Sequence, residues 1–183
     1  MLLVLAAVAC VASVPLFGGR LWRLTSLDVR ATWAALLAAA LQVWITQAPD
    51  GSHALHVVLH FASYALVALF LIANRRLPGM PLLAFGAGLN VLAISANGGV
   101  MPASASALRI AGIDTSDGFA NSAAVAHPHL LWLGDVIPVP GPWPIGNVLS
   151  VGDLLIFAGA LYLLHRTCGS RLALGRQPTP ADS

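Results

Sequence analysis

The fold is decided by the stretch Ala54-Leu-His-Val-Val-Leu-His-Phe-Ala-Ser-Tyr-Ala-Leu-Val-Ala-Leu-Phe-Leu-Ile-Ala73. These 20 consecutive residues contain no formally charged side chain. About 20 predominantly apolar residues are needed for a helix to cross the hydrocarbon core of a bilayer. Lipid cannot satisfy bare backbone groups, and the stretch lacks the alternation of polar and apolar residues that a barrel strand shows. We therefore predict a transmembrane helix at this position.

Four further apolar stretches approach the same length. The five predicted spans are Leu2–Phe17, Thr32–Gln47, Ala54–Ala73, Pro81–Ala96 and Leu149–His165. The chain is 58% hydrophobic and 9% charged, whereas a soluble domain carries about 25% charged residues. The sequence predicts an all-α membrane protein, a bundle of about five transmembrane helices. Residues 1–168 are expected to form a single domain, and residues 169–183 a flexible cytoplasmic tail.

The arginines predict the orientation of the chain. There is no lysine, and eight of the nine arginines fall between spans one and two, between spans three and four, or after span five. These eight are Arg20, Arg23, Arg30, Arg75, Arg76, Arg166, Arg171 and Arg176. The positive-inside rule then predicts the N-terminus outside and the C-terminus in the cytoplasm, across a plasma (inner) membrane.

Charge and cysteine usage exclude other classes of protein. The net charge is +2, and no basic run with interleaved aromatic residues appears, so we expect no nucleic-acid partner. Cys10 lies in an apolar run and Cys168 in a polar one, so both are interpreted as free thiols. The first span lacks a positive start, which favours a retained helix over a signal peptide.

One long connection, residues 97–148, is predicted to face outward. Its first part, Ala103 to Ala126, is small and polar, which is typical of a loop with a short helix. Its second part, Leu130 to Ile145, is apolar and rich in proline, and Trp132 and Trp143 suit a membrane–water interface. We expect an interfacial or re-entrant hairpin at the outer face, before the last helix.

Two aspartates are the candidate catalytic residues. Asp135 and Asp153 are 18 residues apart, and both are predicted at the outer membrane face. Two carboxylates that share a proton can supply an acid and a base, as in aspartic proteases. The competing interpretation is structural, because Ser150-x-x-Asp153 resembles a capping box that begins a helix.

Three further residues are candidates for binding: His60, Asn90 and Asn97. His56 and His60 are spaced i, i+4, with Tyr64 on the same face. Such a pair can bind a metal, but a polar stripe facing other helices explains it equally, and we expect no metal and no cofactor. Asn90 can bridge helices through its amide, and Asn97 can bind a ligand or cap the fourth span before the Gly98–Gly99 pair.

Several blocks run in order along nearly the whole chain and resemble a known family. They are Gly18-Gly-Arg20, Ser63-Tyr64, Asn74-Arg-Arg-Leu-Pro-Gly79, Asn97-Gly-Gly-Val-Met-Pro102, Leu133-Gly-Asp-Val-Ile-Pro138 and Ser150-Val-Gly-Asp153. They resemble a family of small bacterial integral-membrane proteins catalogued as domain of unknown function five-three-one-seven. This resemblance implies a five-helix membrane protein and implies no activity.

The C-terminal part is also similar to lipoprotein signal peptidase. That resemblance implies catalytic roles for Asp135 and Asp153, the second of which opens the last span. Val151 stands where the peptidase has an asparagine, two residues before the second aspartate.

We expect an accessory, interaction or lipid-binding protein rather than an enzyme, with membrane lipid or a membrane protein as its partner. The alternatives are an intramembrane aspartyl hydrolase acting on a lipid-anchored substrate and a small transporter.

Overall fold

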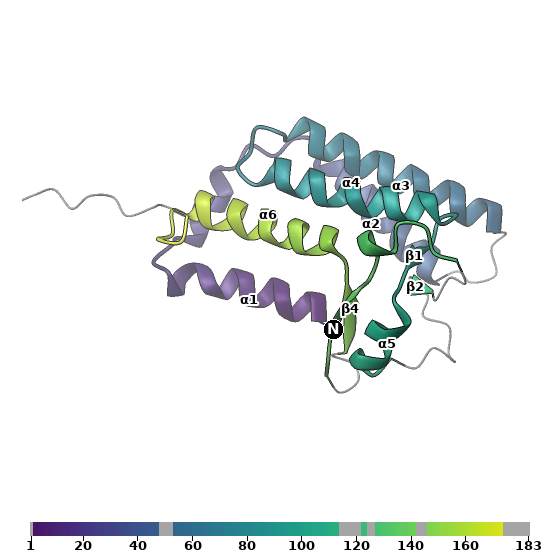
Figure 1. Cartoon of the computed structure of the whole chain (residues 1–183). Helices are drawn as coiled ribbons and strands as arrows, with labels where there is room; N and C mark the ends of the chain where they lie inside the picture. The colour runs from purple at the N-terminus through teal and green to yellow at the C-terminus, as the bar shows by residue number, and fades with distance from the viewer. Residues whose placement is uncertain (1, 48–52, 114–121, 124–126, 142–145, 174–183) are drawn as a thin grey trace, which may run out of the picture.

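The computed structural model describes residues 2–47, 53–113, 122–123, 127–141 and 146–173, and this part of the chain is mostly helical (Figure 1). Its helices are α1 (Leu2–Leu16), η1 (Leu21–Ser26), α2 (Thr32–Gln47), α3 (His53–Ala73), α4 (Met80–Ala96), α5 (Ala105–Ala111), η3 (Leu131–Leu133) and α6 (Val151–Cys168). Its strands are β1 (Met101–Pro102), β2 (Ser122–Ala123), β3 (Ile137–Val139) and β4 (Asn147–Leu149).

Each of the five predicted spans coincides with a helix to within three residues at either end. The last helix starts two residues later than predicted because Leu149 belongs to β4. Ser150 and Asp153 then form a capping box, so the predicted cap is confirmed. The same helix continues past His165 to Cys168, where Gly169 adopts a left-handed conformation and ends it.

Two small sheets correct the all-α expectation. β1 pairs with β2 in parallel, and β3 pairs with β4 in antiparallel fashion, with Ile137 opposite Leu149. The predicted hairpin before the last helix is therefore a two-stranded ladder. The predicted short helix is α5, which packs on this ladder through Ala107, Leu108 and Val148. We call residues 101–149, which the sequence predicts to face outward, the outer cap; residues 114–121, 124–126 and 142–145, including Trp143, lie outside the described residues.

Two of the described helices are long and apolar enough to cross a membrane. They are Leu55–Ala73, with a mean hydropathy of 2.1, and Val151–Cys168, with a mean hydropathy of 1.3. The helices α1, α2 and α4 are apolar but contain 15, 16 and 17 residues. At 1.5 Å per residue they are about 23 to 26 Å long, whereas α3 with its 21 residues is about 32 Å long and matches the roughly 30 Å of a hydrocarbon core. Five apolar helices are therefore present where hydropathy predicts five spans, and two of them are long and apolar enough to cross a membrane.

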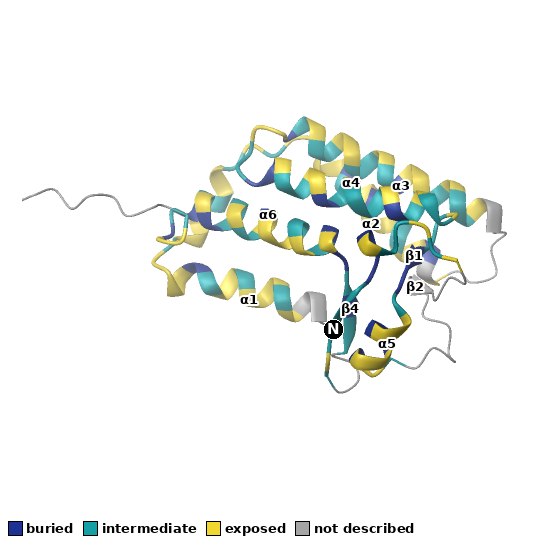
Figure 2. Cartoon of the chain, in the orientation of Figure 1, coloured by how far each residue is buried: buried dark blue, intermediate teal, exposed yellow. Residues whose placement is uncertain are grey.

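The long helices form an open row rather than a closed bundle. The most extensive packing joins α4 to α6 and α2 to α3, and smaller contacts join α3 to α4 and α1 to α6. These contacts order the helices α1–α6–α4–α3–α2, as Figure 1 shows for the first four. Most of their surface is exposed or half-buried (Figure 2).

Glycines bring α4 and α6 into backbone contact. A Cβ on Gly86 would lie 2.5 Å from the carbonyl oxygen of Gly152, and one on Gly159 would lie 2.8 Å from that of Gly79. Gly79, which directly precedes α4, and Gly86 are therefore seven residues apart, as are Gly152 and Gly159 on α6. Small residues at such positions let apolar helices approach closely, which strengthens their van der Waals packing. The sequence predicted the two helices but not this close packing between them.

The arginine-bearing links meet at one end of the row. The backbone N–H of Arg20 donates to the carbonyl of Cys168 at 2.9 Å, and that of Arg171 donates to the carbonyl of Phe17 at 3.0 Å. The Asn74 amide exchanges two hydrogen bonds with the backbone of Arg30, at 2.9 and 2.8 Å. The links after α1, α3 and α6 therefore lie together, opposite the outer cap (Figure 1). We call this the arginine end.

Candidate functional site

Asn90, Ser150 and Asp153 form a closed ring of hydrogen bonds where α4 meets the start of α6. The Asn90 Nδ2 donates to Asp153 Oδ1 at 2.7 Å, and the Ser150 Oγ donates to Asn90 Oδ1 at 2.8 Å. The Ser150 N–H donates to Asp153 Oδ2, and the Asp153 N–H donates to Ser150 Oγ, both at 2.9 Å. The predicted bridging role of Asn90 between helices is therefore confirmed.

This ring defines what Asp153 can do. One of its carboxylate oxygens accepts an N–H from the Asn90 amide and the other accepts the backbone N–H of Ser150, so both oxygens are occupied within the ring. An anion at the N-terminus of α6 also interacts favourably with the helix dipole. Gly152 is required beside it, because a Cβ there would overlap the Asn90 side chain. The ring holds two helices together, and a catalytic role for Asp153 stays a prediction.

Asp135 is buried in the outer cap. Its N–H donates to the carbonyl of Pro102 at 2.9 Å, and its carbonyl accepts the N–H of Ser104 at 3.0 Å. Gly134 permits this approach, since a Cβ there would overlap the Pro102 carbonyl. The β3–β4 ladder places both predicted catalytic residues near the start of α6, and a catalytic role for Asp135 stays a prediction.

Asn97 caps α4 and anchors the outer cap to it. Its Nδ2 donates to the carbonyls of Ala93 and His129 at 2.7 and 2.8 Å, and its Oδ1 accepts the N–H of His129 at 2.9 Å. Gly98 and Gly99 both have positive φ, which turns the chain away from the helix. The amide is thus occupied by backbone partners, as the capping interpretation predicts.

His60 belongs to a separate cluster between α2 and α3. Its Nδ1 lies 3.3 Å from Gln42 Nε2, which donates to Ser63 Oγ at 2.6 Å. The His60 and Tyr64 rings are neighbours, with centroids 5.9 Å apart. Within the described residues, no group of three His, Cys, Asp or Glu side chains is placed to hold a metal ion. The arrangement matches the polar stripe, and binding by His60 stays a prediction.

A third polar network, which sequence reasoning missed, surrounds the buried His165 at the arginine end. The Nε2 of His165 lies 2.9 Å from Ser13 Oγ, and its Nδ1 lies 2.6 Å from Ser170 Oγ. Ser13 donates its hydroxyl hydrogen to the Cys10 carbonyl at 2.6 Å. With the Ser13 hydrogen on this carbonyl, Nε2 is the donor in its contact with Ser13 Oγ. This chain of hydrogen bonds joins α1 to the end of α6. Because Ser13 and His165 are 152 positions apart, no local sequence pattern indicates that they are in contact.

These features define a small helical protein in which buried polar groups join apolar helices. The chain belongs to a family of unknown function (DUF5317), whose model matches residues 26–165. The predicted family is therefore confirmed.

The comparisons with known proteins indicate no biochemical activity. A protein of Thermotoga maritima described as uncharacterized is 40% identical over 97 residues, which are 53% of this chain. The chain spans 56% of the length of that relative. No solved structure matches. The resemblance to lipoprotein signal peptidase is not shown by these comparisons and stays a prediction.

Proposed function

We propose that this chain is a five-span protein of the bacterial plasma membrane that acts by binding lipid or a membrane partner. One observation carries the proposal. The 19 residues Leu55–Ala73 have a mean hydropathy of 2.1, yet only 6% of the 18-residue window within them is buried. A soluble protein covers its most apolar helix with other elements, because large exposed apolar patches are unfavourable in water. Lipid provides that cover here.

The exposed tryptophans support the same placement. Trp22 and Trp33 lie near the arginine end, whereas Trp44 lies near the other end of α2 and Trp132 lies in the outer cap. Tryptophan is enriched at both membrane–water interfaces, where its ring is apolar and its N–H meets water. Two such belts favour α2 as a crossing helix despite its 16 residues. A short span is accommodated by local thinning of the bilayer and by flanking residues that reach the interface.

The arginine end supports an orientation with the N-terminus outside and the C-terminus inside. Six arginines lie in the described links at this end and Arg166 lies in the last turn of α6, whereas Arg109 lies in the outer cap. Arginine is retained on the cytoplasmic side of bacterial membrane proteins. The contacts that join these links favour a common side for all of them.

Binding is favoured over catalysis by the polar groups themselves. Asn90, Asn97 and Asp153 make hydrogen bonds that fasten elements to one another. A group that activates water must be able to exchange a proton with it. Both carboxylate oxygens of Asp153 are instead occupied by N–H groups of Asn90 and Ser150.

An aspartyl hydrolase at the outer face is the second candidate. It is favoured by the burial of Asp135 and by the β3–β4 ladder, which brings Asp135 near the start of α6. This candidate requires that Asp135→Asn and Asp153→Asn each abolish hydrolysis of a lipid-anchored substrate while insertion stays intact. Equal tolerance of both changes in a working assay would eliminate it.

Extraction and labelling test the five-span proposal. The full chain should stay with membranes after an alkaline wash. In intact cells, a membrane-impermeant thiol reagent should label Ser106→Cys in the outer cap and should not label Arg75→Cys. Cys10 and Cys168 alone serve as the background. Labelling of Arg75→Cys from outside, or release of the chain by the wash, contradicts the proposal.

A further inference from the structure

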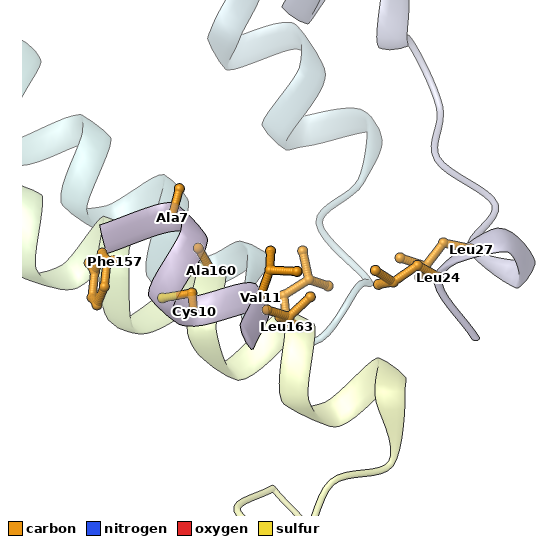
Figure 3. Close-up of a pocket in the computed structure, with 9 residues that line it drawn as sticks. Ala7, Cys10, Val11, Leu24, Leu27, Phe157, Ala160 and Leu163 are labelled. Atoms are coloured by element: carbon orange, nitrogen blue, oxygen red, sulfur yellow. The ribbon is translucent and has the colours of Figure 1, made fainter. Parts of the chain in front are cut away.

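A cavity of about 310 Å³ lies between α1, η1 and α6 (Figure 3). Its apolar walls include Ala7, Val11, Leu24, Leu27, Phe157 and Ala160. Along α6 the lining extends from Phe157 to Leu164, which at 1.5 Å per residue corresponds to about 10 Å. We call it the α1–α6 groove. An elongated apolar groove of this kind fits a linear hydrocarbon chain.

One end of the α1–α6 groove is next to positive charge. Leu24 and Leu27 line that end, and the neighbouring Arg23 places its guanidinium against Gly169, at the C-terminus of α6. Arg20 and Arg171 are bound through their backbones to Cys168 and Phe17 at the same end. In the described part of this end the acidic residue is Asp28, whose carboxylate lies 3.6 Å from Arg30. The surroundings of Arg23 therefore carry an excess of positive charge.

η1 lies between the apolar α1–α6 groove and the positive charge at its end. Its Leu24 lines the groove, its Trp22 is exposed, and its Arg23 lies on the end of α6. Apolar, aromatic and cationic side chains on one short segment are typical of a segment at the level of lipid headgroups. The groove then extends from the headgroup level toward the middle of the bilayer.

We propose that the α1–α6 groove binds one acyl chain of an anionic phospholipid, with the lipid phosphate at Arg23. This inference rests on the proposed membrane location and names the lipid. Guanidinium groups bind phosphate oxygens through a planar pair of N–H donors, so arginine suits this headgroup. An anionic lipid matches the excess positive charge better than a zwitterionic one.

Native mass spectrometry of the full chain in mild detergent tests the proposal. The probes are phosphatidylglycerol and phosphatidylethanolamine with the same acyl chains, at equal concentration. Wild-type protein should retain phosphatidylglycerol in excess. Arg23→Gln should lower that retention about fivefold, the effect of one arginine near an anionic surface. Arg76→Gln removes an exposed arginine at the same end and should leave retention unchanged.

Two substitutions fill the groove from different helices. Ala160→Phe acts from α6 and Val11→Phe from α1, so a folding defect in one does not decide the outcome. Each should abolish retention of phosphatidylglycerol. Ala158→Phe places the same ring on exposed surface of α6 and should retain the lipid.

Equal retention of both lipids by the wild-type chain would overturn the proposal. So would wild-type retention in both groove-filling variants. If those variants change the protein from dimer to monomer with no change in lipid, the groove belongs to a second copy instead. Release of the chain from membranes by an alkaline wash contradicts the proposed function; a chain that stays embedded without lipid preference contradicts this inference alone.

Discussion

At the scale of single residues, Asn90 joins two helices through both polar atoms of its side chain. It belongs to α4, yet its donor and its acceptor both serve the start of α6. Because Ser150 and Asp153 also cap each other, one amide supports a helix start and a helix–helix contact together. Its two bonds add to the glycine contact between the same helices.

Asn90→Ala should lower the free energy of unfolding by about 1–3 kcal/mol, because it leaves Asp153 Oδ1 and the Ser150 hydroxyl without this partner. Thermal or denaturant unfolding of the purified protein in detergent measures the loss. Ser95→Ala, at an exposed position of the same helix, is the matched control. Equal stability of the two variants would contradict a structural role for the ring.

The sequence predicted part of this site for a clear reason. The Ser150–Asp153 cap is local, since its residues are three positions apart, and so is the turn at Asn97. The bond from Asn90 to Asp153 joins residues 63 positions apart, so the sequence indicated that Asn90 bridges helices but not to which partner. The His165 network was missed for the same reason.

At the scale of elements, the glycines of α4 and α6 determine how closely the two helices pack. Gly79 and Gly86 face Gly159 and Gly152, so two pairs of turns are in backbone contact. Helix bounds were predictable because hydropathy and capping residues act along the chain. The pairs of helices that pack together were not predictable, because the sequence does not distinguish a glycine that contacts another helix from one that faces open space.

Gly159→Val should destabilise the α4–α6 contact, because its Cβ would lie 2.8 Å from both the Gly79 carbonyl oxygen and the Leu83 nitrogen. Overpacking of this kind costs about 1–3 kcal/mol. Gly88→Val carries the same change in helix propensity into a position with nothing within 4 Å, which makes it the control. Unfolding in detergent measures both variants, and a difference near zero would contradict the close contact.

At the scale of the whole molecule, the open row leaves α1 and α2 at its two edges. The charged links gather at one end of the row and the folded outer cap at the other, with apolar helices between them. This division into three zones is the pattern that a bilayer imposes, with an apolar middle and polar borders.

Tryptophan fluorescence tests these zones. In vesicles with brominated lipids, variants that retain only Trp22 or only Trp132 should be quenched most by bromine near the headgroups. Both side chains are exposed near the borders of the apolar zone. Phe61→Trp, in the middle of α3 and without the native tryptophans, should be quenched most by bromine deep in the acyl chains. Deep quenching of Trp22 or Trp132 would contradict the proposed placement.

The ring at the start of α6 also bears on how movement would pass through the protein. Ser150 directly follows β4, and the ring fixes the angle at which the β3–β4 hairpin enters α6. A partner that displaces the hairpin must therefore tilt or slide the helix with it, since the junction has no free hinge. The far end of that helix carries His165 and its bond to α1. Under the proposed orientation, an event outside the cell would in this way reach the arginines on the inner side as a joint displacement of α6 and α4, which the ring and the glycine contact hold together.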